Sequence, residues 1–207
     1  MSKAFRSPLF LFLLVVIFIG LVTLVGPQER SLGSNVRIIY LHGAWVLTAE
    51  VAFLAAALLG TAALLTRRAA LHAWSRALGW TGTFFWVTYL PLSQWAMQTN
   101  WNGLFLAEPR FRMALIFAVT GVLLQVGLWL LNQSWLTSLV NIVFIIALRV
   151  VFATASNVMH PPPSPIFNSG NFAIIAFFIV LNLLTWVAAY LLTRVLLTLT
   201  DKKDSIH

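Results

Sequence analysis

Six long apolar stretches, separated by short polar or proline-rich segments, divide the chain. An apolar run of about 20 residues is what a hydrocarbon core of roughly 30 Å requires of a membrane-spanning helix. The alternating apolar and polar positions of a membrane β-barrel strand are absent from the sequence. The pattern predicts an all-α integral membrane protein, a single transmembrane domain over 1–207 with six spans, at approximately 8–25, 38–65, 78–95, 113–131, 135–156 and 172–197.

Prolines and polar residues set the predicted limits of these spans. Arg67 and Arg68 end the second span, and Pro91 is expected to kink or end the third, because proline lacks the backbone donor that a helix needs. An outer loop is predicted over 96–112, and the proline-rich segment 160–165 is expected to be non-helical. The first span follows basic residues as a signal peptide does, but no small-x-small cleavage site follows it, which favours a retained anchor.

Basic residues set the predicted orientation. The net charge is +8 and only 9% of residues are charged. The basic residues lie at the ends of the apolar runs, as the positive-inside rule describes, so we expect no nucleic-acid partner. Eight basic residues lie on one side of the predicted membrane and four on the other. This asymmetry places both termini on the cytoplasmic side of a bacterial-type inner membrane. The eight are Lys3, Arg6, Arg67, Arg68, Arg76, Arg194, Lys202 and Lys203, and the four are Arg30, Arg37, Arg110 and Arg112.

Two histidines close the outer ends of predicted spans. His42 opens the second span and His160 follows the fifth. A single histidine at a membrane surface is usually a hydrogen-bonded polar residue, but two at matching depth on different helices also suit the axial positions of a haem iron. The chain has no cysteine, which excludes disulfides and covalent haem attachment, so a bound haem would be of the b type.

The outer loop supplies further candidates. Trp101 and Phe105 are aromatic side chains able to cover a flat apolar ring, and Arg110 and Arg112 are able to pair with carboxylates such as haem propionates. The alternative is an amphipathic interfacial helix whose arginines reach the headgroups. The residue pattern alone leaves both interpretations open.

Three motifs resemble, in their residues and in their order along the chain, those of the haem-handling proteins of cytochrome c biogenesis. These proteins are the haem exporter protein C family and its relatives in the cytochrome c synthetase. Those proteins carry a Tyr-x-His stretch followed by Ala-Trp, a tryptophan-rich outer loop ending in Asp-(Ala/Pro)-(Arg/Lys), and an Asn-x-x-His motif. The corresponding residues here are Tyr40-Leu41-His42-Gly43-Ala44-Trp45, Glu108-Pro109-Arg110 and Asn157-Val158-Met159-His160. The chain departs from the family in having Glu108 for Asp and in lacking most of the loop tryptophans.

The resemblance implies a membrane protein that binds haem b non-covalently, with His42 and His160 as its iron ligands. It also implies propionate contacts and a macrocycle lining, for which we expect Arg110, Arg112, Glu108, Trp101, Phe105 and Trp45. A haem chaperone, a cytochrome or other membrane subunits are the expected partners at the outer face. The alternatives are a fixed haem-binding or structural subunit of a respiratory or photosynthetic electron-transfer complex, and a haem-free transporter or scaffold. No pattern of catalytic base, nucleophile or hydrolytic metal site is present, so we expect no enzyme activity.

Two charged residues lie inside the predicted spans. Glu50 is eight residues after His42, and Arg149 is eleven residues before His160. These spacings correspond to depths of roughly 12 and 16 Å. Because an unpaired intramembrane charge is costly, we predict an ion pair between the second and fifth spans, with a proton or ion route as the alternative. The polar residues Gln125, Asn141 and Asn182 are expected to form interhelical hydrogen bonds, and His72 and His207 to be solvated.

Overall fold

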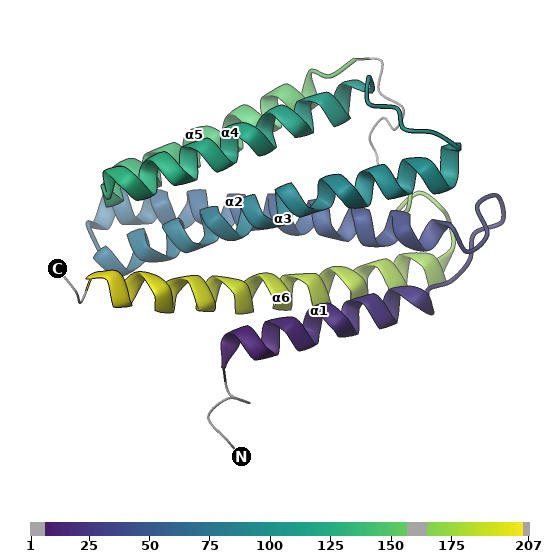
Figure 1. Ribbon diagram of the computed structural model, residues 1–207, viewed down its shortest axis with the longest axis horizontal. Helices are drawn as coiled ribbons and strands as arrows, with labels where there is room; N and C mark the ends of the chain where they lie inside the picture. Colours follow the sequence, from purple (N-terminus) through teal and green to yellow (C-terminus); the bar gives the residue numbers. More distant parts are fainter. Residues whose placement is uncertain (1–6, 157–164, 205–207) are drawn as a thin grey trace.

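The computed structural model describes residues 7–156 and 165–204, and within these ranges the regular structure is helical (Figure 1). An isolated bridge between Glu29 and Gly33 is the one β-type pairing among the described residues. The helices are α1 (Pro8–Leu24), α2 (Val36–Thr66), α3 (Ala69–Trp101), α4 (Pro109–Leu131), α5 (Ser134–Ala153) and α6 (Phe172–Asp204). The predicted all-α class is confirmed.

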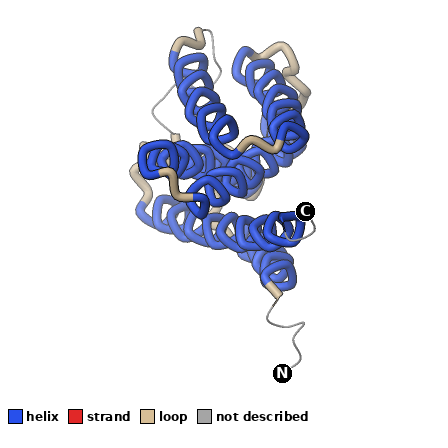
Figure 2. Tube along the Cα trace, turned by 90° about the vertical axis from the view of Figure 1, so that its left-hand side faces the viewer, coloured by secondary structure: helices blue, strands red, loops and turns tan. Residues whose placement is uncertain are grey.

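The helices form three layers of two. Figures 1 and 2 show α2 and α3 in the middle, α4 and α5 on one side of them, and α6 with α1 on the other. At one end of the bundle, α2 turns into α3 and α4 turns into α5. We call this the basic end, because Arg67, Arg68, Arg76 and Arg194 lie toward it. The opposite end, where α2 begins and α3 leads into the segment 102–108, is called the loop end.

Four helices, α2, α4, α5 and α6, are long and apolar enough to cross a membrane. Helix α1 is apolar but has only 17 residues, and α3 is long but more polar. Large apolar side chains project from the outer faces of the spans, among them Leu58, Ile116 and Leu123, each more than 60% exposed. Apolar residues that would be unfavourable on a water-facing helix are favourable against lipid, so the surface agrees with a multi-pass membrane protein.

The middle layer packs closely because small residues line it. A Cβ atom added to Gly82 of α3 would lie 2.6 Å from the ring of Phe53 on α2, and one added to Gly60 of α2 would lie 2.9 Å from Ser75 Oγ on α3. Buried alanines, including Ala49 and Ala56, extend this face of α2. Small residues let two membrane helices approach until their side chains interlock, which supplies the packing that lipid does not drive.

Helix α3 differs most from its predicted span. It covers Ala69–Trp101 where 78–95 was expected, and Pro91 lies inside it without ending it. The polar residues near the end of α3 are held against the start of α2. Asn35 Nδ2 donates to the Thr99 carbonyl at 3.2 Å, and Asn100 Nδ2 lies 3.4 Å from the Asn35 carbonyl. The outer loop is therefore 102–108, and the predicted 96–112 was too wide at both ends.

Helix α4 begins at Pro109, four residues before the expected start. Glu108 is its N-cap, with its carboxylate Oε2 accepting a hydrogen bond from the Phe111 backbone N–H at 2.6 Å. Proline suits the first helical position because its missing donor would be unused there. The other limits differ less, with α5 ending at Ala153 and α6 continuing to Asp204.

Candidate functional site at the loop end

His42 lies two turns into α2 and is half-buried. Its ring centroid is 5.5 Å from that of the buried Tyr89 on α3, with the planes tilted by 57°. Tyr89 in turn meets Trp86 edge-on at 5.0 Å. The imidazole therefore projects from a regular helix and rests against an aromatic wall, which restricts its orientation.

The chain that follows His160 returns to the same part of α2. A Cβ atom built on Gly43 would lie 3.3 Å from the Phe178 ring of α6 and 3.8 Å from Ile166 Cδ1. His160 itself lies outside the described residues. Ile166 follows it by six positions, a length of chain that spans at most about 20 Å. Glycine beside His42 thus lets the segment after the proline-rich stretch pack against the helix that carries the histidine.

Trp45 is part of the interface between α2 and α3. It is buried, its indole N–H donates to Thr88 Oγ1 at 2.8 Å, and its ring centroid is 4.7 Å from that of Phe85. It lies one turn from His42 on the same face of α2. The contacts of Trp45 place it as a packing residue beneath the histidine.

The motif Glu108-Pro109-Arg110 forms the first turn of α4. Glu108 has the capping role described above, and Arg110 is half-buried while Arg112 is exposed. The motif therefore starts α4 and places a half-buried arginine in its first turn.

Trp101 and Phe105 lie at the tip of the loop end. Their ring centroids are 6.4 Å apart in an edge-to-face arrangement. Leu104, Phe105 and Leu106 are 52%, 42% and 48% exposed, so the loop presents an apolar surface outward. An apolar tip of this kind suits contact with a flat apolar ligand, a membrane surface or a partner protein.

Glu50 and Arg149 form the predicted ion pair. Arg149 Nη1 donates to Glu50 Oε2 at 2.9 Å, which joins α2 to α5. The Arg149 side chain is 61% exposed and that of Glu50 21%.

The described residues can be compared with the ligand groups that metal sites in proteins use. Among the described residues, no three histidine or acidic side chains lie together as a metal ion would require. A haem iron takes one imidazole on each side, and the porphyrin itself supplies the other four ligands. Within the described ranges, His42 is the histidine at the loop end, and the aromatic rings of Tyr89, Trp101 and Phe105 lie at the same end of the bundle.

The loop before α2 contains a further acidic residue with a different role. Glu29 Oε2 accepts hydrogen bonds from the Ser31 N–H at 2.8 Å and the Leu32 N–H at 3.1 Å, and it also accepts from the Ser31 hydroxyl. These bonds, the one from the Ser31 hydroxyl foremost, hold the pKa of Glu29 below its usual value of 4.5. Glu29 therefore stabilises the loop between α1 and α2 in which it lies.

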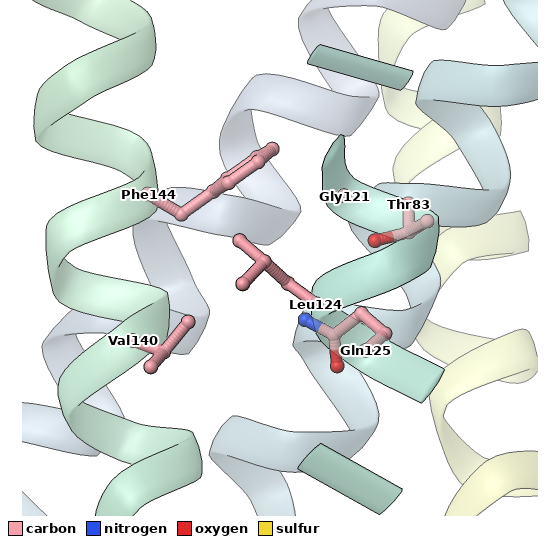
Figure 3. A pocket seen from close by; sticks show the side chains of 6 residues that line it. All are labelled: Thr83, Gly121, Leu124, Gln125, Val140 and Phe144. Atoms are coloured by element: carbon pink, nitrogen blue, oxygen red, sulfur yellow. The ribbon is translucent and has the colours of Figure 1, made fainter. Parts of the chain in front are cut away.

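At the basic end, one chain of hydrogen bonds crosses four helices. Ser75 Oγ of α3 donates to the Ala56 carbonyl of α2 at 2.8 Å, and Asn141 Nδ2 of α5 donates to the Ser75 carbonyl at 2.9 Å. Gln125 Nε2 of α4 donates to Asn141 Oδ1 at 3.1 Å. Next to Gln125 is a hollow too small for a guest molecule, shown in Figure 3 with its six lining residues. The expected interhelical role of Gln125 and Asn141 is confirmed.

Two polar residues differ from expectation. His72 is part-buried, and its Nδ1 lies 2.7 Å from Ser138 Oγ on α5, so the prediction that it is solvated was wrong. Asn182 Nδ2 donates to the Phe178 carbonyl of its own helix at 2.7 Å, which is an intrahelical bond where an interhelical one was expected. Pairing across helices depends on the tertiary fold, and no local sequence signal identifies it. His207, like His160, lies outside the described residues.

The fold defines the class of this chain: within the described residues it is an all-helical protein with four helices long and apolar enough to cross a membrane. No protein-family model, curated protein or solved structure matches the chain.

Proposed function

We propose that this chain is a six-span protein of a bacterial-type cytoplasmic membrane that binds one haem b at its outer surface. Both termini face the cytoplasm in this proposal, and the loop end faces outward. His42 and His160 are the axial ligands. Arg110 and Arg112 hold the propionates, with Glu108 fixing the first turn of the helix that carries them. Trp101 and Phe105 cover the macrocycle, and Trp45 supports the site from below.

The observation that supports the proposal is the shared location of two of the three sequence motifs. His42 and the cap formed by Glu108 are separated along the chain but belong to the same end of the bundle. The segment containing Ile166, six residues after His160, packs beside Gly43 at this end.

Several of the described residues would supply something that a haem site requires. The aromatic wall of Tyr89 restricts the His42 ring, and the ion pair of Glu50 with Arg149 ties the helix bearing His42 to α5, which precedes His160. A guanidinium at the start of α4 suits a propionate because it offers paired donors to a carboxylate. A haem with two imidazole ligands supplies one-electron transfer when bound and has no open position for oxygen.

Handling of haem for cytochrome c assembly is the function that the motifs favour. In that role, the apolar tip around Trp101 and Phe105 meets a haem chaperone or a cytochrome. The second candidate is a fixed haem-binding or structural subunit of an electron-transfer complex. The exposure of Arg149 favours this candidate, because a charge on the outside of a membrane helix is stabilised by a partner that covers it.

The test is a reduced-minus-oxidised visible spectrum of the purified chain with its haem content. We expect a b-type spectrum at near one haem per chain. His42→Ala and His160→Ala are each expected to lose the haem or to turn it high-spin. The matched control is His72→Ala, a histidine at the opposite end that contacts Ser138, which should keep the haem.

Two results would contradict the proposal. Well-folded wild-type protein that takes up no haem, even when haem is added, would favour the alternative that the chain is a haem-free scaffold. Equal loss from all three alanine variants would mean that haem content follows general stability. Haem that exchanges readily with added apo-cytochrome would indicate handling, and haem that resists extraction would indicate a fixed subunit.

A further inference from the structure

A second cavity lies between α2, α3 and α6. Its volume is about 130 Å³, and its main lining residues are Val51, Ala55, Trp74, Leu78, Trp186 and Tyr190. The lining is apolar because the nearby hydroxyls are engaged across helices. Thr48 Oγ1 donates to Thr185 Oγ1 at 2.7 Å, and Thr81 Oγ1 lies 2.9 Å from Thr193 Oγ1. The cavity therefore offers a guest apolar contact without a polar donor of its own.

The cavity opens toward the outside of the bundle. Val51, Trp186 and Tyr190 line it and are 40%, 41% and 50% exposed. An apolar cavity of about 150 Å³ holds one benzene, so this one has room for a segment of a single hydrocarbon chain and not for a whole bulky ligand. In a membrane, the chain that reaches such an opening is the acyl chain of a lipid.

A cation lies at the rim. Arg194 Nη1 donates to the Tyr190 hydroxyl at 3.0 Å, and the guanidinium carbon is 5.9 Å from the Tyr190 ring centroid. Tyr190 in turn stacks on Trp74, with ring centroids 6.5 Å apart and planes within 21°. Arginine has five N–H donors, so this contact leaves donors for an anion.

The depth of Arg194 suits a lipid headgroup. It is 22 residues along α6 from Phe172, a rise of roughly 33 Å, which matches the thickness of the hydrocarbon core. Arg67, Arg68 and Arg76 lie toward the same end of the bundle. The acidic residues near the end of α6, Asp201 and Asp204, are balanced in the sequence by Lys202 and Lys203. The rim is thus cationic where a phosphate would lie.

We propose that this cavity binds an anionic phospholipid, with one acyl chain between α2, α3 and α6 and the phosphate on Arg194. The proposal is independent of haem. We expect a phospholipid rather than a soluble ligand because the cavity opens on the lipid-facing surface. We expect an anionic headgroup because the adjacent side chain, Arg194, is positively charged.

The experiment is native mass spectrometry of the full chain in detergent, titrated with phosphatidylglycerol or with phosphatidylcholine of identical acyl chains. The wild type should bind phosphatidylglycerol about five-fold more tightly, the effect of one basic residue near an anionic lipid. Arg194→Gln should remove this preference by weakening phosphatidylglycerol binding more than phosphatidylcholine binding, while Arg194→Lys should keep most of it. Arg68→Gln, which removes an exposed charge at the same end away from the cavity, should keep the preference.

A cavity-filling variant tests the chain site separately. Ala55 is half-buried at the cavity wall, so Ala55→Leu should weaken binding of both lipids by a similar factor while helix content stays at the wild-type level. The proposal is wrong if Ala55→Leu binds both lipids as the wild type does. It is also wrong if Arg68→Gln and Arg194→Gln reduce the preference equally, because the selectivity would then belong to the whole basic surface.

Discussion

The two ends of the bundle are held together by different means. At the basic end, a continuous chain of hydrogen bonds links α2, α3, α5 and α4 through Ser75, Asn141 and Gln125. Toward the loop end, α4 and α5 diverge from the middle layer, as Figure 1 shows. They are joined to it by the Glu50–Arg149 pair near the middle of α2 and by the bond from the Trp86 indole N–H to the Ala114 carbonyl at 3.0 Å. One hydrogen-bonded chain therefore connects four helices at the basic end, whereas these two contacts each connect a single pair of helices.

This difference separates residues that specify the fold from residues available for binding. Buried amide and hydroxyl groups that satisfy one another require one arrangement of the helices, because any other would leave polar groups unpaired in an apolar surrounding. At the loop end, His42 rests against the ring of Tyr89, and Glu108 caps the first turn of α4. The haem site proposed above belongs to this end of the bundle.

The largest effect on stability is expected at Gly79, where α3 packs against the side-chain amides of Asn141 and Gln125. A Cβ atom at this position would lie 2.7 Å from Asn141 Oδ1 and 2.8 Å from Gln125 Nε2, so Gly79→Ala must displace the bond between these side chains. We expect the free energy of unfolding to fall by about 2–3 kcal/mol, as in other overpacked cores. The measurement is reversible unfolding in mixed micelles of dodecyl sulfate and a mild detergent.

The same substitution at Gly127 is the matched control. A Cβ atom there meets no other atom within 4 Å, so Gly127→Ala should be neutral or stabilising by up to about 1 kcal/mol, since alanine favours helix over glycine. Equal stability of the two variants would show that the hydrogen-bonded chain does not fix the basic end.

Much of the fold follows from the sequence, and the differences have local causes. Apolar length predicts the helices because the membrane core sets their minimum size. The early start of α4 also had a local signal, an acidic residue before proline, that the hydropathy pattern obscured. The length of α3 had none, because the bonds of Asn35 with the end of α3 depend on α2 lying beside it.

The candidate site shows the same division. Matching depths on two spans predicted the ion pair of Glu50 with Arg149, and the structure confirms it. The contact of His72 with Ser138 depends on the packing of α3 against α5 and had no local signal. The role of His42 with His160 stays a prediction.

An intermediate effect is expected from breaking the ion pair toward the loop end. Glu50→Gln leaves the guanidinium of Arg149 without its carboxylate partner, and we expect a loss of about 1–2 kcal/mol. This is below the full cost of an arginine at the centre of a membrane helix, because Arg149 is four residues from the end of α5 and its long side chain can extend toward the membrane surface. The double variant Glu50→Gln with Arg149→Gln should be less destabilised than the sum of the single variants. Additive losses in this cycle would mean that the pair is not energetically coupled.

The smallest effect concerns Glu108, and it separates a structural role from a role in binding. Its carboxylate caps α4 through the Phe111 N–H, so Glu108→Ala should cost about 1 kcal/mol of stability, while Glu108→Asp, also a capping residue, should recover most of it. If the cap is its whole contribution, haem content of the aspartate variant equals that of wild type, because Arg110 keeps its place in the first turn. A stable aspartate variant with less haem would instead assign the Glu108 carboxylate a direct part in the loop-end site.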